Sequence, residues 1–290
     1  MLTAQSEIGE LRKVLLKQPA AAFRSQSDID RQWRDLNYLD APDFASAARE
    51  FEAFLAIFEA QGVEVCFLPD DIDTGMDSLY VRDASIITDE GAVLCRMGKP
   101  ARRGEPAASG AGLSTVGVST HGSISGEGQI EGGDVAWLDP ETLVVGRGYR
   151  TSAEGIRQLR ALLPDRVALV EVPLPHWQGP ADVFHLMSML SPIDRDLLLV
   201  YSPLLPVPFR EYLLERGFGL VEVPDEEFES MGCNVLALGP RRCLMLEGNP
   251  ITRARLEAAG AEVICYEGEE ISRKGCGGPT CLTRPLLRAL

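Results

Sequence analysis

Two acidic side chains, a histidine and a cysteine recur at near-regular intervals along this chain of 290 residues. The recurrence has steps of 51, 51, 49 and 47 residues and stands at Asp83, Asp134, His185, Asn234 and Cys281. A thiol, an imidazole and carboxylates together can carry out nucleophilic catalysis, in which the thiolate attacks and the imidazole moves protons. A fixed period of about 50 residues is typical of repeated supersecondary units. We therefore expect each unit to bring one of these positions to a common site.

The unit that begins at Gly133 shows the expected order of elements. Residues 134–140 and 142–146 are predicted to form a strand hairpin, and residues 166–173 a closing strand. Between them, Thr151-Ser-Ala-Glu154 has the spacing of a helix capping box, and apolar residues follow at helical intervals. The order is strand, strand, helix, strand.

Two further copies are predicted downstream, over 185–223 and 233–265, with His185 and Cys233 opening their first strands. Upstream, residues 80–88 and 92–96 are predicted to pair around an Asp-Glu-Gly turn. The stretch 106–126 is rich in Gly, Ala and Ser, which leaves the helix of that copy undefined. We interpret part of it as a mobile loop.

The fifth copy is predicted to be divided between the two ends of the chain. Its first strand would be 281–287, its second 11–17, its helix 44–60 and its last strand 63–68. Sharing one unit between the ends closes a ring without an unpaired repeat. We therefore predict an α/β fold, a five-bladed pseudosymmetric propeller of ββαβ units, in a single domain spanning residues 1–290.

Composition and charge restrict the class of partner. The net charge of −15 argues against nucleic acid and anionic membranes, and it mildly favours a small cationic ligand, although solubility alone would also explain it. No segment approaches the roughly 20 apolar residues of a membrane span, and the N-terminus lacks the pattern of a secretion signal. The odd count of 7 cysteines fits a reducing cytoplasm better than a disulfide framework. A homodimer is compatible with the sequence.

Six segments, taken together, resemble the guanidine-modifying superfamily, also called the amidinotransferase-fold or pentein superfamily. The chain is most similar to its dimethylarginine dimethylaminohydrolases, over nearly its whole length. The segments are Met76–Asp83, Ala101–Glu105, Glu131–Asp134, Tyr149–Gly155, His185–Leu186 and Gly277–Cys281. The resemblance implies five ββαβ units in a ring with a central site, and no metal or organic cofactor.

Carried over by position, the resemblance implies a role for nine residues. Cys281 would be the nucleophile and His185 the acid and base, with Asp83 and the catalytic Glu131 facing the guanidinium. Asp77, Arg102, Arg150 and Gly275 would hold the amino-acid end of the substrate. Arg102 and Arg150 would face its carboxylate, and the backbone carbonyl of Gly275 would accept a hydrogen bond from its amine. Arg82, next to Asp83, is also counted among the predicted substrate-binding residues.

The chemistry of these residue types agrees with that implication. A guanidinium carbon is a poor electrophile, and a thiolate is a strong side-chain nucleophile near neutral pH. A histidine can protonate the departing amine and then deprotonate the attacking water. Carboxylates facing a planar guanidinium make paired, charge-assisted hydrogen bonds that orient its carbon toward the sulfur.

Two positions bear on the substrate. Arg82 is the residue found in arginine deiminases, whereas dimethylarginine hydrolases commonly have an acid there. Met187 replaces an aspartate that deiminases and amidinotransferases carry, which leaves more room and less charge at one guanidino nitrogen. We therefore expect hydrolysis of an Nω-methylated arginine to citrulline and a methylamine through a covalent thiouronium-type intermediate.

Other interpretations stay open at this point. They are hydrolysis of unmodified arginine or a related guanidine, amidine transfer to an amine, and a non-catalytic binding member of the fold. A metal bound by Asp83, Glu131, His185 and Cys281 is a further alternative, although no compact ligand spacing supports it. Asn234 receives no role beyond ending its strand, and Cys276 is interpreted as an incidental neighbour of Cys281.

Overall fold

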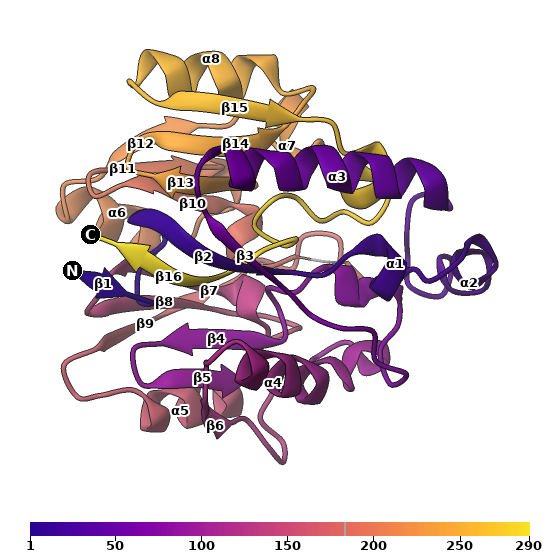
Figure 1. Cartoon of the computed structure of the whole chain (residues 1–290). Coiled ribbons are helices and arrows are strands. Elements are labelled where there is room, and N and C mark those ends of the chain that lie inside the picture. The colour runs from indigo at the N-terminus through magenta and orange to yellow at the C-terminus, as the bar shows by residue number, and fades with distance from the viewer. Residues whose placement is uncertain (183) are drawn as a thin grey trace.

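The computed structural model describes residues 1–182 and 184–290, which form a mixed α/β fold with five small sheets. Figure 1 shows α8 (Pro250–Ala258) at the top of the molecule and α4 (Glu105–Thr115) and α5 (Ala153–Leu162) at the bottom, outside the strands. The two chain ends lie next to each other on the left of the view. None of the helices in the described part of the chain has the length and apolar character needed to cross a membrane.

Four of the sheets repeat one pattern: an antiparallel hairpin, then a third strand that returns parallel to the second. The first comprises β4 (Ser85–Thr88), β5 (Gly91–Leu94) and β6 (Thr120–Ser123), with α4 before β6. The second comprises β7 (Val135–Asp139), β8 (Thr142–Arg147) and β9 (Ala168–Pro173), with α5 before β9. The predicted order of strand, strand, helix, strand is confirmed for both.

The third and fourth sheets follow the same order. The third comprises β10 (Leu190–Asp194), β11 (Leu197–Val200), α6 (Val207–Glu215) and β12 (Gly219–Glu222). The fourth comprises β13 (Val235–Gly239), β14 (Arg242–Leu246), α8 and β15 (Glu262–Tyr266). Short helices connect the sheets: α1 (Pro19–Ala22), α2 (Gln26–Gln32), α7 (Asp225–Phe228), the single turns η1 (Met76–Leu79), η2 (Pro100–Arg102), η3 (Gly132–Asp134), η4 (Leu186–Ser188) and η5 (Ser202–Leu204), and the π-helical turn η6 (Glu269–Arg273).

The fifth sheet joins the two ends of the chain, as predicted. Its order is β1 (Leu2–Thr3), β16 (Arg284–Ala289), β2 (Glu10–Leu16) and β3 (Glu64–Phe67), with β16 antiparallel to both of its neighbours. The long helix α3 (Phe44–Ala60) covers this unit and buries Phe51, Phe54 and Phe58. Phe54 packs on Tyr266 of β15, with ring centroids 4.8 Å apart, so α3 also contacts the neighbouring sheet.

The first strands of several units begin later than the sequence predicted. β4, β10 and β16 start at Ser85, Leu190 and Arg284, whereas the predicted strands started at residues 80, 185 and 281. The intervening segments are turns, and most of their residues are as buried as the strands they precede. Buried apolar residues such as Val81, Leu186 and Leu282 occur in these turns as well as in the strands, so hydrophobicity alone does not separate the two.

Most of residues 106–126 belongs to α4 and β6, which complete the unit, and the predicted loop is limited to residues 116–119 and 124–126. The small residues serve close packing in α4. A Cβ atom at Gly110 would stand 2.8 Å from Leu94 Cδ1, and one at Gly112 would overlap Leu68. The tertiary contacts thus outweigh the low helix propensity of glycine.

The N-terminal cap of α5 also differs from the prediction. Ser152, not Thr151, caps the helix, and its Oγ accepts a hydrogen bond from the Gly155 amide at 3.1 Å. Thr151 instead donates to Asp134 Oδ2 at 2.6 Å. Asp134 also accepts from the Leu186 amide at 3.0 Å and so ties two turns of the site together.

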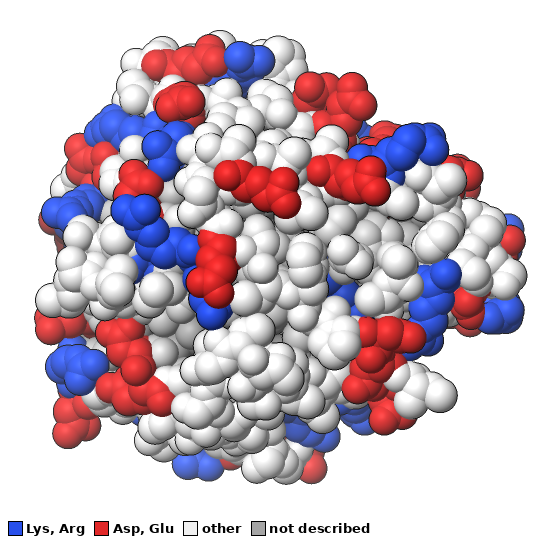
Figure 2. Space-filling view, viewed as in Figure 1, with Lys and Arg blue, Asp and Glu red and all other residues white. Residues whose placement is uncertain are grey.

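One face of the molecule shows how its charged side chains are distributed. On the face shown in Figure 2, acidic and basic side chains are interspersed, and the basic ones do not gather into a patch. This distribution agrees with the small-ligand interpretation of the net charge of −15.

Candidate active site

The turns that precede the first strands place the recurring residues together. Asp83, Glu131, His185, Asn234 and Cys281 stand one to five residues before β4, β7, β10, β13 and β16. His185 Nε2 lies 2.7 Å from Glu131 Oε2, and Asn234 Nδ2 lies 3.2 Å from Cys281 Sγ. Residues separated by up to about 200 positions therefore meet in one site.

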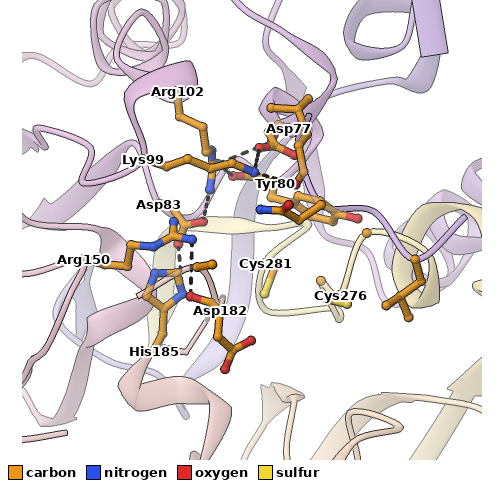
Figure 3. A pocket seen from close by; sticks show the side chains of 16 residues that line it. Asp77, Tyr80, Asp83, Lys99, Arg102, Arg150, Asp182, His185, Cys276 and Cys281 are labelled. Atoms are coloured by element: carbon orange, nitrogen blue, oxygen red, sulfur yellow. Dashed lines mark hydrogen bonds and ion pairs between the residues drawn. The ribbon is translucent and has the colours of Figure 1, made fainter. Parts of the chain in front are cut away.

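A cavity of about 140 Å³ opens at this place. Seven of the nine residues predicted for the site line it: Asp77, Asp83, Arg102, Arg150, His185, Gly275 and Cys281. Figure 3 shows Asp77, Lys99 and Arg102 toward one end of the cavity, and His185, Arg150 and Asp182 toward the other, with Cys281 between them. Glu131 does not line this cavity. It is fully buried, hydrogen-bonded to His185 and ion-paired with Arg150.

His185 and Glu131 form a buried pair suited to proton transfer. Burial alone would lower the pKa of His185, but the carboxylates of Asp83, Asp134 and Glu131 raise it to about 9. Burial alone would raise the pKa of Glu131, but the hydrogen bond and charge of His185, helped by Arg150, lower it to about 2. At neutral pH the pair is thus an imidazolium beside a carboxylate. A Cβ at Gly133 would overlap the His185 ring, so this turn requires glycine.

Asp83 and Arg102 form an ion pair in the cavity. Asp83 accepts from Arg102 Nη1 at 2.6 Å and from the Gly133 amide at 2.9 Å. Arg102 is also held by Glu105, at 2.8 Å, and the structure thereby adds a residue to which the sequence analysis gave no role. Burial raises the pKa of the Glu105 carboxyl to about 7, although Arg102 opposes the shift. In the sequence, the only sign of a role for Glu105 was its position three residues after Arg102, a spacing at which opposite charges can pair on a helix.

Lys99 is a second residue that sequence reasoning missed. Its Nζ lies 2.6 Å from Asp77 Oδ2 and donates to the Leu36 carbonyl at 2.8 Å. The backbone amides of Gly98 and Lys99 also donate to Glu131 Oε1, at 2.9 and 3.1 Å. No pattern distinguished this lysine from a surface residue, because its role depends on the turn between β5 and α4.

Arg82, which the sequence predicted to bind substrate, does not line this cavity but lines an adjoining one that also includes Cys281. Its side chain is fully buried, its Nε donates to the Thr280 carbonyl at 2.7 Å, and its Nη1 lies 3.3 Å from Glu7 Oε1. These bonds connect the N-terminal segment to the turn that carries Cys281. Arg82 therefore supports the position of that turn from behind.

The Cys281 turn depends on close packing around its glycines. A Cβ at Gly277 or Gly275 would overlap Tyr80, and one at Gly278 would stand 2.5 Å from Asn234 Cγ. Gly277 and Gly278 are buried. Gly275 lines the cavity, and the bond from its carbonyl to a substrate amine stays a prediction.

Asn234 holds the thiol of Cys281 by a hydrogen bond that the sequence did not indicate. Thr280 donates to Asn234 Oδ1 from its amide at 3.1 Å and from its hydroxyl at 2.7 Å. Both donors fix the amide oxygen, so the Asn234 NH₂ group must face the sulfur. Burial and Asp83 raise the pKa of the Cys281 thiol, and the Asn234 and Thr280 hydrogen bonds oppose that rise.

We expect loss of this donor to make the thiol less acidic. In Asn234→Ala, the pH dependence of Cys281 alkylation by iodoacetamide should move upward by about one pH unit, because a hydrogen bond to a charged group contributes about 1.5–3 kcal/mol. Asn234→Asp should move it further, since a carboxylate would then face the sulfur. Labelling is measured by peptide mass spectrometry, and Cys276 in the same protein is the internal control. An unchanged Cys281 profile in both variants would contradict a role for Asn234 in tuning the thiol.

Asp83, Glu131 and His185 also meet the geometry of a metal-binding group, since one ligand atom from each lies within 4.8 Å of the others. Their present partners favour a different use. His185 Nε2 is bonded to Glu131, and Arg102 and Arg150 compensate the two carboxylates. Cys281 is outside this group, so the four-ligand set considered from the sequence does not form among the described residues.

Comparison with known proteins gives one consistent family. A family model described as "N,N dimethylarginine dimethylhydrolase, eukaryotic" matches residues 22–288. The N(G),N(G)-dimethylarginine dimethylaminohydrolase of Streptomyces coelicolor is 31% identical over 243 residues, which is 83% of this chain and 86% of that protein. An arginine deiminase of Rhodococcus opacus is 27% identical over 256 residues, covering 75% of this chain and 61% of its own length.

A solved structure shares the fold. DDAH from Pseudomonas aeruginosa, as a cysteine-to-serine mutant complexed with citrulline, superimposes with a TM-score of 0.75 at 25% identity, covering 94% of this chain and 98% of that one. The likeness therefore extends over most of both chains.

Proposed function

The chain belongs to the dimethylarginine dimethylaminohydrolase family of hydrolases that cleave carbon–nitrogen bonds of amidines, and we propose that it converts an Nω-methylated arginine to citrulline and a methylamine. The observation that carries the proposal is the meeting of Cys281 with the His185–Glu131 pair at a cavity lined by charges of both signs. A cationic guanidine with a zwitterionic amino-acid end complements such a lining.

In the proposed reaction, the Cys281 thiol releases its proton to solvent when the cationic substrate binds. The thiolate then attacks the guanidino carbon, and His185 donates its proton to the departing methylamine. A thiouronium remains on the sulfur. His185, now neutral, takes a proton from water, the water oxygen bonds to the same carbon, and the carbon–sulfur bond breaks to release citrulline. Glu131 orients His185 and stabilises its imidazolium form. The guanidinium charge beside Cys281 favours the thiolate, which offsets the effect of burial on that thiol.

The ion pairs of the cavity indicate how the substrate would be held. Asp83 is paired with Arg102, Glu131 with Arg150, and Asp77 with Lys99. A bound guanidinium would replace Arg102 as the partner of Asp83. The substrate carboxylate would in turn replace Asp83 or Glu131 as the partner of Arg102 or Arg150. Binding then exchanges ion pairs and leaves few charges unpaired, which is the condition for burying charge at low cost.

The surroundings of Met187 support a substituted guanidine. Met187 is buried and lines a second cavity next to Cys281, where it contacts Arg82 Nη1 at 3.5 Å. A thioether accommodates a methyl group, whereas a carboxylate there would favour an NH₂ group. Unmodified arginine is the second candidate, favoured by the arginine deiminase relatives.

We further propose that the five sheets close into a five-bladed propeller around this site, within a single domain of residues 1–290. The pairing of β16 with β1 and β2 supports closure, because it leaves no unit open at either end. All seven cysteines are free, which supports a reducing compartment such as the cytoplasm.

The substrate proposal predicts a ranked response to a guanidine panel. Purified protein should release citrulline from Nω-methylated arginines with kcat/KM about tenfold or more above that for arginine, because Met187 offers no carboxylate to a free NH₂ group. Citrulline release and amine formation are measured with dimethylarginine, monomethylarginine, arginine and agmatine. Met187→Asp should shift the preference toward arginine. If the unaltered protein prefers arginine, arginine replaces the methylated arginines as the proposed substrate. If new guanidines form when amines are added, the protein transfers the amidine group instead of hydrolysing it.

A further inference from the structure

A second cavity, of about 380 Å³, adjoins the first and shares Cys281 and His185 with it. Apart from the shared residues it has a different lining, which includes Trp177, Phe184, Met187, Phe228, Met231 and Asn234. A substrate whose amino-acid end occupies the smaller cavity has its reacting carbon at Cys281. The larger cavity is therefore next to the nitrogen that leaves.

The wall of this cavity is held by a stack of aromatic rings. Phe228, at the end of α7, stacks on Tyr201 with ring centroids 3.9 Å apart. Trp177 meets Phe228 edge to face at 5.9 Å, and Gln178 Nε2 donates to Glu229 Oε1 at 3.4 Å beside them. Aromatic and thioether groups offer apolar contact area with little conformational freedom to lose.

The cavity is much larger than a methyl substituent requires. One water molecule, which is close to a methyl group in size, needs about 15 Å³ of such space. Two methyl groups would therefore leave most of the 380 Å³ unfilled by substrate. Besides its apolar side chains, this cavity is bordered by the polar side chains of Arg82, Gln178, Asp182, Ser188 and Glu229. Along the apolar part of the lining, displacement of water by an apolar group is favourable.

We propose that this second cavity binds the substituent of the leaving amine, and that the substituent is an apolar alkyl or aryl group larger than methyl. The inference rests on the proposed function and names a broader substrate class for the same site. The overall step balances with water alone: an Nω-substituted arginine and water give citrulline and the corresponding primary amine. His185 supplies the proton that the departing amine takes up.

The test is a homologous series of Nω-methyl-, propyl- and pentyl-arginine with the full-length protein. Each methylene group buried should raise kcat/KM about fourfold until the cavity is filled. Citrulline release reports the rate. A pentyl derivative hydrolysed no better than the methyl derivative would overturn the inference, even if the methyl derivative is a good substrate.

A substitution in the cavity wall tests whether the cavity, and not the reacting groups, causes the dependence on chain length. Trp177→Ala should lower the ratio of pentyl to methyl kcat/KM at least threefold, because the indole offers apolar contact area that a longer chain buries to a greater extent than a methyl group does. Phe67→Ala is the matched control, since both aromatic side chains are 38% exposed and Phe67 lines neither cavity. A ratio that Trp177→Ala leaves unchanged would contradict the assignment of this wall.

Failure of the proposed function is distinguishable from failure of the inference. If no methylated arginine is hydrolysed, the proposed function is wrong. The cavity is then tested by calorimetric binding of the same series to Cys281→Ser. Affinity that increases with chain length supports an apolar amine-side cavity, and affinity that does not increase overturns it.

Discussion

Replacing Cys281 by serine should lower kcat by about 10⁴-fold or more, with little change in substrate binding, because removal of a covalent nucleophile typically has an effect of this size. A serine hydroxyl is far less ionised near neutral pH and is the weaker nucleophile toward a guanidino carbon. The affinity should persist, since the charged residues that line the smaller cavity are unchanged. The measurements are steady-state citrulline release and calorimetric binding of substrate.

Two other cysteines make this experiment specific. Cys66→Ser, remote from both cavities, should retain normal activity. Cys276 lines the same cavities as Cys281. Although the residue as a whole is exposed, partial burial of its thiol raises the pKa of that thiol, and the charge of Asp182 adds to the rise. Loss of turnover in Cys276→Ser together with full activity in Cys281→Ser would transfer the nucleophile to Cys276.

Replacing Glu131 by glutamine should lower kcat/KM by roughly a hundredfold and move its alkaline limb to lower pH. His185 acts as the acid only while protonated, so activity falls as pH rises through its pKa, which is about 9 with Glu131 present. Removing one of the carboxylates that hold the proton lowers this pKa, and activity is then lost at a lower pH. The kcat/KM profile between pH 6 and 10 measures the shift.

Glu154→Gln is the control for this profile. Glu154 is an exposed carboxylate of α5 that pairs with Arg157, so the same chemical change there should leave the limb near pH 9. An alkaline limb that stays in place in Glu131→Gln would show that another group sets it.

Much of the fold could be predicted from the sequence because the five units repeat one local pattern. The hairpins, the amphipathic helix at 44–60 and the division of the fifth unit between the chain ends all follow from periodicity and turn residues. The starts of β4, β10 and β16 were predicted too early, since buried apolar residues such as Val81, Leu186 and Leu282 occur in the turns before them as well as in the strands. Helix α4 was missed because its glycines are explained only by the packing of Leu68 and Leu94.

Seven of the nine residues predicted for the site line the smaller cavity, whereas the contacts among them were less predictable. The spacing of Asp83, His185 and Cys281 indicated that they meet, because equivalent positions of repeated units face the same place. The partner of each residue depends on side-chain directions that spacing does not contain. The bond from Asn234 to Cys281, and the burial of Arg82 against Glu7, are of this kind.

The most direct test of the account is to trap the bond between Cys281 and the guanidino carbon. The protein is mixed with dimethylarginine, quenched in acid within milliseconds to seconds and digested, and the peptide containing Cys281 is weighed. The account predicts a transient mass increase equal to that of the substrate less dimethylamine, located on Cys281 and lost in Cys281→Ser. Turnover of this substrate with no adduct on Cys281, or with the adduct on another residue, would contradict it.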